Sequence, residues 1–221
     1  MRKLILPFLL TPILVVAVIW SGERNAVPSA LTYGLTLAEI PPRVDVEALS
    51  GGVRTRRTCS GAALDEKTVV TSAHCVAGAT YTSIVDGALR MEVKSVEIHK
   101  KWTSGDPRYD VALVHLGEPL LQPVKQVSFA DGSLDEGSYT LTAWSFNTAT
   151  GCSMSVPPLD SKGHYHMRCL LSKGASGSGL FLGNGEGRTL VGVLSQLSDG
   201  VASLAPASSV ADLYRAPHLG Y

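Results

Sequence analysis

The sequence contains little charge, and the charge is not concentrated in any one stretch. Charged residues make up 17% of the 221 residues, with 19 basic and 19 acidic side chains. The one short basic run, Arg54–Arg57, is typical of a solvated strand face. Because no basic patch of the kind that binds a phosphate backbone is present, the sequence predicts no nucleic-acid partner.

Metal-binding cysteine patterns are also missing. The four cysteines include no C-x-x-C pair, and their spacing does not fit a zinc ribbon or finger. We therefore predict no metal and no cofactor.

Only one long apolar run occurs, Leu4–Trp20, and it follows Arg2 and Lys3. This arrangement is typical of an export signal whose charged end stays in the cytoplasm, so residues 1–30 are expected to be a signal peptide or a membrane anchor. Sites for signal cleavage are poor, and the choice between cleaved signal and uncleaved anchor stays open. The rest of the chain is expected to be secreted, periplasmic or at the cell surface, with membrane contact only through residues 4–20.

An even number of cysteines in an exported chain predicts two disulfides, for which three pairings are possible. The favoured set joins near neighbours, Cys59 with Cys75 and Cys152 with Cys169, and closes two short loops in different halves of the chain.

Helical periodicity is scarce and is seen only at Ser208–Arg215, with Ser208 or Ser209 as a possible cap. The remainder shows many short strand-like runs separated by turn signals, which predicts an all-β protein: a sandwich or a pair of barrels. The expected strands are Val44–Leu49, Val53–Leu64, Thr68–Thr71, Tyr81–Val85, Met91–His99, Val111–Leu116, Lys125–Phe129, Tyr139–Trp144, Tyr165–Leu170, Gly179–Leu182 and Thr189–Leu197.

The stretch Lys173–Phe181, reading K-G-A-S-G-S-G-L-F, places Ser176 among glycines that allow a sharp bend and an exposed hydroxyl. A glycine-rich turn without chemistry has the same appearance. A serine becomes a nucleophile only with a base in hydrogen-bond reach and an acceptor that orients the base.

Two residues elsewhere can fill these roles. His74 ends a short apolar strand in T-S-A-H-C-V, and Asp110 precedes a buried-looking run in Y-D-V-A-L-V-H-L. A carboxylate at such a buried position needs a donor, and the His74 ring is one. The chain order His, Asp, Ser excludes the α/β-hydrolase and subtilisin arrangements.

With these motifs the chain resembles the chymotrypsin-like (trypsin-fold) serine proteases. T-S-A-H-C-V is similar to T-A-A-H-C, C-S-G-A-A-L to C-G-G-S-L-I, Y-D-V-A-L-V-H-L to D-I-A-L-L, and G-A-S-G-S-G-L-F to G-D-S-G-G-P-L. The resemblance extends over about Val44–Arg215, and the G-x-S-G-S form is that of bacterial members. It implies two packed six-stranded antiparallel β-barrels with a short C-terminal helix, within one protease domain of residues 31–221: barrel one at about 43–120 and barrel two at about 124–221.

The resemblance also implies the chemistry. Ser176 attacks the scissile carbonyl of a polypeptide, His74 transfers the proton, Asp110 orients the imidazole, and the amides of Gly174 and Ser176 form the oxyanion hole.

For substrate binding, the resemblance implies that Ser195, Gln196 and Leu197 run beside the substrate backbone as an antiparallel strand. Leu170 stands at the position of the first-pocket floor, where trypsin-type enzymes have an aspartate. With Gly200 leaving a pocket wall open, an apolar or small first-pocket side chain is expected.

The chain departs from the family pattern at the residue before the nucleophile and in its disulfides. Ala175 stands where animal members have an aspartate that pairs with a new N-terminal amine, so activity is expected not to depend on that ion pair. The family bridge beside the histidine is retained as Cys59–Cys75, while Cys152–Cys169 is expected to replace another family bridge. Ser178 is a remote rival nucleophile.

The sequence thus predicts an exported serine endopeptidase that works through an acyl-enzyme. Two alternatives stay open: a non-catalytic binding module with a protease fold, and an esterase with the same triad.

Overall fold

The computed structural model describes residues 43–50, 53–86, 88–121, 124, 127–130, 137–145, 148–156, 164–168, 171, 174–182, 189–198 and 201–216. The expected export segment, residues 1–30, lies outside these ranges. Within them, no helix has the length and apolar character needed to cross a membrane.

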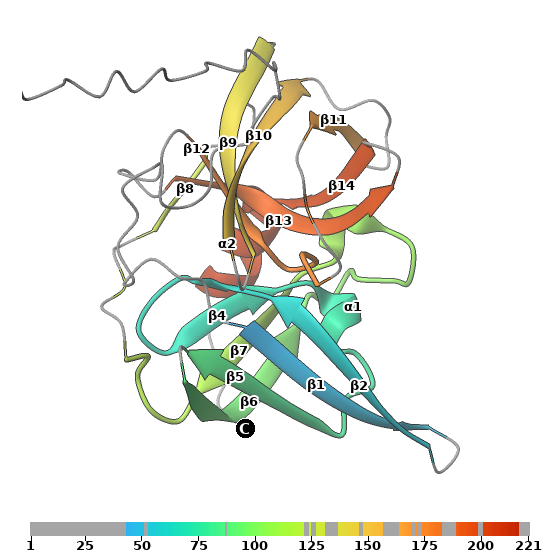
Figure 1. Cartoon of the computed structure of the whole chain (residues 1–221), viewed down its shortest axis with the longest axis vertical. Coiled ribbons are helices and arrows are strands. Elements are labelled where there is room, and N and C mark those ends of the chain that lie inside the picture. The colour runs from blue at the N-terminus through green and yellow to red at the C-terminus, as the bar shows by residue number, and fades with distance from the viewer. Residues whose placement is uncertain are drawn as a thin grey trace, which may run out of the picture.

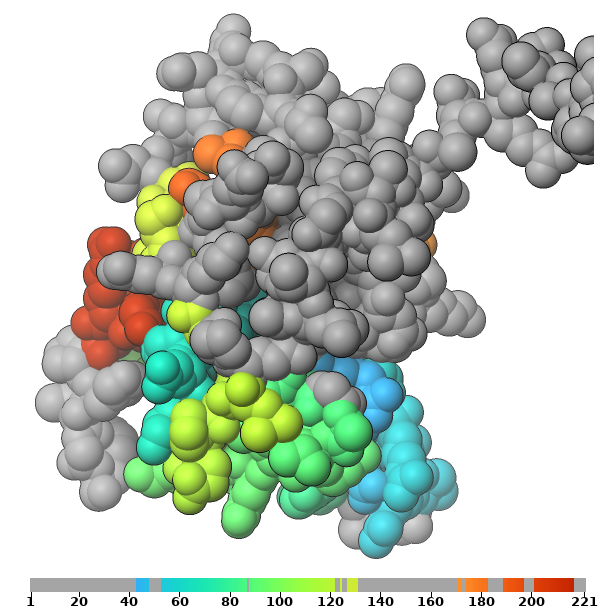
Figure 2. Space-filling view, turned by 60° about the vertical axis from the view of Figure 1, so that its left-hand side comes forward, coloured from blue at the N-terminus to red at the C-terminus, as the bar shows by residue number. Residues whose placement is uncertain are grey.

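The N-terminal half forms one antiparallel sheet, in the lower part of Figure 1, and its described residues occupy the lower part of the space-filling view in Figure 2. Its strand order is β2-β1-β5-β6-β7-β4-β3. Strands β2 and β3 are consecutive and separated only by Gly61, where a Cβ would lie 2.6 Å from a methyl carbon of Val69. Glycine at this bend therefore lets the chain pass from one edge of the sheet to the other. The strands are β1 (Arg43–Ser50), β2 (Val53–Ser60), β3 (Ala62–Ala63), β4 (Thr68–Thr71), β5 (Tyr81–Asp86), β6 (Leu89–Ile98) and β7 (Ala112–Leu116).

The C-terminal half forms a second sheet, in the upper part of Figure 1, with the order β12-β9-β10-β11-β14-β13-β8. An additional β12–β13 pairing closes six of these strands into a ring, to which β8 adds in parallel beside β13. The strands are β8 (Ser128–Phe129), β9 (Gly137–Ser145), β10 (Thr148–Val156), β11 (His164–Arg168), β12 (Gly179–Leu182), β13 (Thr189–Ser198) and β14 (Val201–Pro206).

The predicted all-β architecture with a short C-terminal helix is confirmed, with differences in detail. Each sheet has seven strands rather than six. In the first sheet the expected strand Val53–Leu64 is divided at Gly61, and in the second the short β8 pairs with β13 outside the six-stranded ring. The helix α2 (Ala207–Arg215) starts one residue earlier than expected, after Pro206 as N-cap. Ser208 and Ser209 therefore lie inside the helix, and neither serves as its cap.

A hydrophobic core joins the two sheets. Buried side chains of β3, β4 and β7 pack against those of β12, β13 and α2. The loops that run between these strands are thereby held at the junction of the two halves. The central members of this cluster are Val70, Leu113, Phe181, Leu190, Val193, Val210 and Leu213.

A polar contact also joins the two halves at α2. The Tyr214 hydroxyl donates to the Asp65 carboxylate in the turn before β4, over 2.7 Å, while the other oxygen of that carboxylate accepts from the Lys67 amide. Burial, followed by the hydrogen bond to this anion, raises the pKa of Tyr214 to about 12.

Replacement of Tyr214 by phenylalanine is expected to lower the free energy of unfolding by about 1 kcal/mol, because a hydrogen bond to a charged acceptor is lost. Since the folded-state pKa is raised, this contribution is present below the unfolded tyrosine pKa of about 10 and disappears as the pH rises through about 12. Denaturant unfolding at pH 7 measures the loss. Tyr81, 48% exposed, provides the control, and an equal effect of Tyr81→Phe would show that the Asp65 contact contributes nothing.

Candidate active site

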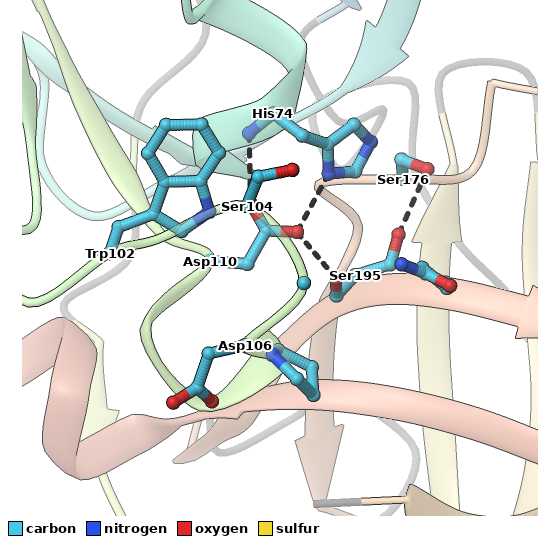
Figure 3. Close-up of a pocket in the computed structure, with 10 residues that line it drawn as sticks. His74, Trp102, Ser104, Asp106, Asp110, Ser176 and Ser195 are labelled. Carbon is cyan, nitrogen blue, oxygen red and sulfur yellow. Dashed lines mark hydrogen bonds and ion pairs between the residues drawn. The ribbon is translucent and has the colours of Figure 1, made fainter. Parts of the chain in front are cut away.

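A cavity of about 410 Å³ lies at the junction of the two halves (Figure 3). Its lining includes His74, Asp110 and Ser176, the three residues that the sequence motifs single out. Another part of the wall comes from the loop between β6 and β7, where Trp102 and Asp106 line the cavity. The structure thus brings the three predicted residues together from three separate stretches of the chain.

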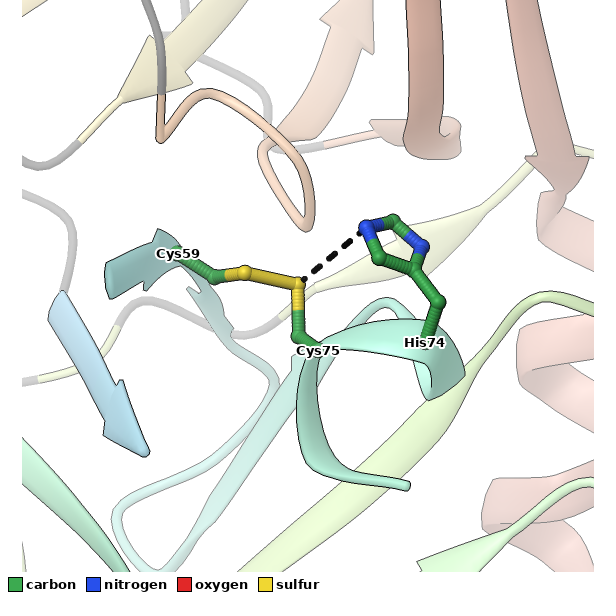
Figure 4. A group of neighbouring side chains, drawn as sticks. All are labelled: Cys59, His74 and Cys75. Carbon is green, nitrogen blue, oxygen red and sulfur yellow. Dashed lines mark hydrogen bonds between the residues drawn. A yellow bond between two sulfur atoms is a disulfide. The ribbon is translucent and has the colours of Figure 1, made fainter. Parts of the chain in front are cut away.

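His74 lies on a single helical turn, α1 (Ala73–Val76), directly after β4. The predicted disulfide Cys59–Cys75 is present and ties this turn to the end of β2 (Figure 4). The Arg57 guanidinium adds two hydrogen bonds, to the carbonyls of His74 at 3.2 Å and of Ala77 at 3.1 Å. The backbone that carries the imidazole is therefore fixed by one covalent and two polar links to the neighbouring strand.

Three possible metal-ligand atoms meet beside this turn. The sulfurs of Cys59 and Cys75 and one ring nitrogen of His74 lie within 4.8 Å of one another (Figure 4). Both sulfurs are bonded to each other, so neither is a thiolate available to a metal. The other predicted bridge, Cys152–Cys169, lies outside the described side chains.

Asp110 follows the short 3₁₀ turn η3 (Pro107–Tyr109) and is only 4% exposed. One carboxylate oxygen accepts the His74 amide at 2.8 Å, and the other accepts His74 Nδ1–H at 2.7 Å together with the Ser195 hydroxyl (Figure 3). Burial by itself raises the pKa of Asp110, but these hydrogen bonds and the His74 ring outweigh it and hold the pKa below the usual value of a carboxyl group. Asp110 is therefore an anion that accepts from His74 Nδ1 and so keeps a proton on that ring nitrogen.

The other carboxylate at the cavity, Asp106, has a different role. It caps η3 by accepting the Arg108 amide at 3.0 Å, and it forms an ion pair with the Arg108 guanidinium at 2.8 Å. These contacts identify Asp106 as a turn-forming residue, in agreement with its S-G-D-P context.

Ser176 and His74 do not hydrogen-bond to each other in this structure. The Ser176 hydroxyl donates to the carbonyl of Ser195 at 3.1 Å, and His74 Nε2 lies 3.6 Å from the Cys75 sulfur. Catalytic hydrogen bonds are often absent or long before substrate binds. A hydrogen bond between them would require the Ser176 hydroxyl to turn from the Ser195 carbonyl.

Ser176 lies in a turn between two glycines with left-handed backbone angles, Gly174 at φ 92° and Gly177 at φ 87°. The Ser176 amide has no hydrogen-bond acceptor among the described residues, which is the condition required of an oxyanion donor. Ser178, the rival nucleophile, is fully buried and cannot reach a substrate from the cavity.

The predicted substrate strand corresponds to the end of β13. Ser195 and Gln196 line the cavity, while Leu170, Gly200 and the Leu197 side chain lie outside the described part of the chain. The β13–β14 register shifts between Leu194 and Gln196, which leaves Ser195 without a partner in β14. This bulge aims the Ser195 carbonyl at Ser176 and its hydroxyl at Asp110.

Sequence reasoning missed two features of this site. The hydroxyl of Ser195 had no assigned role, although a serine at the end of the apolar run L-V-G-V-L is a visible signal. Trp102 was also given no role in the site, although it packs against the N-terminal core and lines the cavity.

Comparison with known families supports the same interpretation of the fold. The family model described as Trypsin matches residues 41–211. The chain belongs to the trypsin family of serine proteases.

Three solved structures with this fold share about a fifth of their residues with the chain. The Rv3671c protease of M. tuberculosis in its active form has a TM-score of 0.59 at 21% identity, covering 96% of this chain and 92% of that one. The protease Anisep of Arthrobacter nicotinovorans has a TM-score of 0.61 at 20% identity, and the match covers 79% of this chain and 94% of that one. A scabies mite inactivated protease paralogue, S-I1, has a TM-score of 0.58 at 19% identity, and the match covers 80% of this chain and 94% of that one. Since an inactivated paralogue shares the fold, the fold alone does not establish catalysis.

Proposed function

We propose that this trypsin-family chain is an exported serine endopeptidase that hydrolyses peptide bonds through an acyl-enzyme intermediate. The observation that carries the proposal is the buried Asp110 carboxylate, which holds His74 Nδ1 at 2.7 Å on a cavity that Ser176 also lines. A buried anion paired with an imidazole and a nearby hydroxyl is the combination that activates a serine nucleophile.

The proposed reaction starts when the Ser176 hydroxyl turns from the Ser195 carbonyl to His74 Nε2. The Ser176 oxygen attacks the substrate carbonyl, and its proton moves to Nε2 as the C–O bond forms. Asp110 stabilises the resulting imidazolium, which then protonates the leaving amine. Water, activated by the same imidazole, hydrolyses the acyl-enzyme and releases the second product.

Charge that develops on the substrate oxygen requires donors at the same cavity. The amides of Gly174 and Ser176 are the proposed pair, and one such donor is worth about 3–4 kcal/mol of transition-state stabilisation in other proteases. Bound peptide is proposed to pair with Ser195, Gln196 and Leu197, and to place an apolar or small side chain in the first pocket.

Export is part of the proposal. The disulfide Cys59–Cys75 is typical of oxidising compartments, and it supports the interpretation of residues 1–30 as a signal or anchor.

The second candidate is a non-catalytic module, favoured by one observation: the resting contact of His74 Nε2 with Cys75 rather than with Ser176. An esterase would use the same residues on a different carbonyl.

A fluorophosphonate probe applied to the folded full chain distinguishes enzyme from module, because it reacts only with an activated serine. We expect labelling of the native protein and none of Ser176→Ala, with Ser178→Ala labelled as the native protein is. Absence of labelling of the native chain would favour the module. Release of peptides from a diverse mixture, compared with release of acid from aryl esters, then distinguishes endopeptidase from esterase.

A further inference from the structure

Among the described residues, the nucleophile loop, residues 174–177, accepts hydrogen bonds from the N-terminal sheet through Ser60, the last residue of β2. The Ser60 hydroxyl donates to the Gly174 carbonyl at 2.8 Å, and the Ser60 amide donates to the Ser176 carbonyl at 2.8 Å. These contacts join residues 114 or more positions apart in the sequence. Ser60 is fully buried, whereas the accepting residues Gly174 and Ser176 are partly buried.

The two accepting carbonyls flank one peptide unit. The Gly174 carbonyl belongs to the peptide before Ala175, and the Ser176 carbonyl to the peptide after Ser176. The peptide between them carries the Ser176 amide, which is a proposed oxyanion donor. Because both neighbouring peptide planes are fixed by Ser60, the direction of this amide is restricted.

Ser60 is itself held in place. Its carbonyl accepts the hydroxyl of Thr71 at 2.8 Å, and Thr71 is fully buried at the end of β4. On the other side of the loop, the Gly177 amide donates to the Leu194 carbonyl at 2.7 Å. The loop is thus fixed from both sheets by uncharged groups.

The residue inside the loop cannot provide this restraint. Ala175 is 4% exposed and carries only a methyl group, so no side-chain charge at position 175 fixes the turn. Its carbonyl accepts the Ser178 amide at 2.9 Å, a bond within the turn that does not attach it to either sheet.

We infer that Ser60 is a positioning residue for the oxyanion hole: its hydroxyl and amide, acting from the N-terminal sheet, hold the loop Gly174–Gly177 so that the Ser176 amide faces the substrate carbonyl. The inference rests on the proposed function for its catalytic consequence, whereas the restraint on the loop stands independently. No cleavage of the chain is needed to form the hole in this arrangement.

Ser60→Ala removes the hydroxyl bond to Gly174 and keeps the amide bond to Ser176. With the fluorophosphonate probe, whose phosphoryl oxygen occupies the oxyanion hole, we expect the limiting rate of labelling to fall about 10- to 100-fold, less than or equal to the effect of deleting one oxyanion donor. The probe concentration at half-maximal rate is expected to stay within about threefold, because initial binding does not use the hole.

Tyr214→Phe is the control. The Tyr214 hydroxyl also joins the two halves of the chain, by donating to the Asp65 carboxylate at 2.7 Å, and this bond involves no residue of the nucleophile loop. Tyr214→Phe also loses one hydrogen bond between the two halves, whereas its limiting labelling rate is expected to stay within about threefold of the native value.

Hydrogen exchange tests the restraint without any need for activity. The amides of Gly177 and Ser178 are hydrogen-bonded, and we expect their exchange to become about tenfold faster in Ser60→Ala than in Tyr214→Phe. Faster exchange in Ser60→Ala, together with a native chain that does not react with the probe, would support the restraint and contradict the proposed function. A labelled native chain whose Ser60→Ala variant shows unchanged labelling and unchanged exchange would overturn the inference and leave the proposed function intact.

Discussion

Replacement of Asp110 by asparagine is expected to reduce kcat by about 10⁴-fold, the loss caused by a wrong histidine tautomer in a serine protease triad. The expectation follows from the three donors around this carboxylate: the His74 amide on one oxygen, and His74 Nδ1–H and the Ser195 hydroxyl on the other. A carboxylate accepts all three, whereas an asparagine side chain has one accepting oxygen and one donating NH₂ group.

Either orientation of the new amide leaves a conflict. If its oxygen faces the His74 ring, its NH₂ group opposes the His74 backbone amide, donor against donor. If its oxygen faces the backbone amide, its NH₂ group donates to Nδ1 and moves the ring proton to Nε2. An imidazole protonated at Nε2 cannot take the Ser176 proton, so this second state is inactive.

Hydrolysis rates of Asp110→Asn, Ser195→Ala and Asp106→Asn measure the effect. Ser195→Ala removes one of the three donors and is expected to cost about tenfold or less, while Asp106→Asn, whose parent carboxylate bonds Arg108, is expected to lose less still. Nitrogen NMR of the His74 ring reports the tautomer directly. If Asp110→Asn kept the native kcat, Asp110 would not be the orienting acid.

Because the pKa of Asp110 is lowered in the folded chain, the stability difference between the native chain and Asp110→Asn depends on pH. A carboxyl group whose pKa is lower in the folded chain stabilises the fold above its unfolded pKa of about 3.9, and this contribution disappears as the pH falls through the folded-state pKa. The stability difference between the native chain and Asp110→Asn is therefore expected to shrink in the acidic range below about pH 4, as measured by denaturant unfolding at neutral and acidic pH.

Local sequence patterns predicted the short buried strands well. Thr68–Thr71 and Gly179–Leu182 have the expected bounds, because each is a brief apolar run between turn signals. β10 and β14 were missed, since T-A-T-G-C-S-M-S-V and V-A-S-L-A-P contain small and polar residues without a clear alternation. α1 was missed because a four-residue turn is too short to show helical periodicity.

The candidate site, like the fold, could be predicted from the sequence only in part. Motif order was sufficient to select His74, Asp110 and Ser176, which the structure brings to one cavity. The bulge at Ser195 and the bonds from Ser60 to the nucleophile loop could not be predicted, because they depend on contacts between segments 85 and 114 residues apart. The resting partners of Ser176 and His74 are likewise tertiary features that no local pattern encodes.

Replacement of Gly177 by alanine is expected to lower the free energy of unfolding by at least about 3 kcal/mol and to abolish probe labelling. Gly177 has a φ of 87°, which costs about 1–2 kcal/mol for a residue with a side chain. In addition, a Cβ at this position would lie 2.1 Å from the Ser60 carbonyl oxygen and 2.3 Å from the Thr71 hydroxyl oxygen. Since real Cβ atoms do not approach other heavy atoms so closely, the loop and β2 must separate.

Gly78→Ala is a control that distinguishes the cost of a left-handed backbone from the cost of a steric clash at the Cβ. Gly78 has a φ of 68°, and a Cβ there would have no heavy atom within 4 Å, so this variant carries the left-handed strain alone. We expect it to lose about 1–2 kcal/mol and to keep its reaction with the probe. Equal unfolding midpoints for the two variants would mean that the loop is not packed against Ser60 as the structure has it.

A second test of Gly177→Ala asks which of the two oxygens near the new Cβ, that of Ser60 or that of Thr71, causes the clash. Thr71→Ala removes the side-chain oxygen that a Cβ at position 177 would meet, but the closer atom is the backbone carbonyl oxygen of Ser60, which no substitution removes. Moreover, Thr71→Ala deletes the hydrogen bond that fixes this carbonyl. The double variant Gly177→Ala/Thr71→Ala is therefore expected to be no more stable than Gly177→Ala alone and to remain unlabelled. Recovery of labelling would show that a side-chain contact, rather than the approach of the two backbones, requires glycine at the junction between the nucleophile loop and the N-terminal sheet.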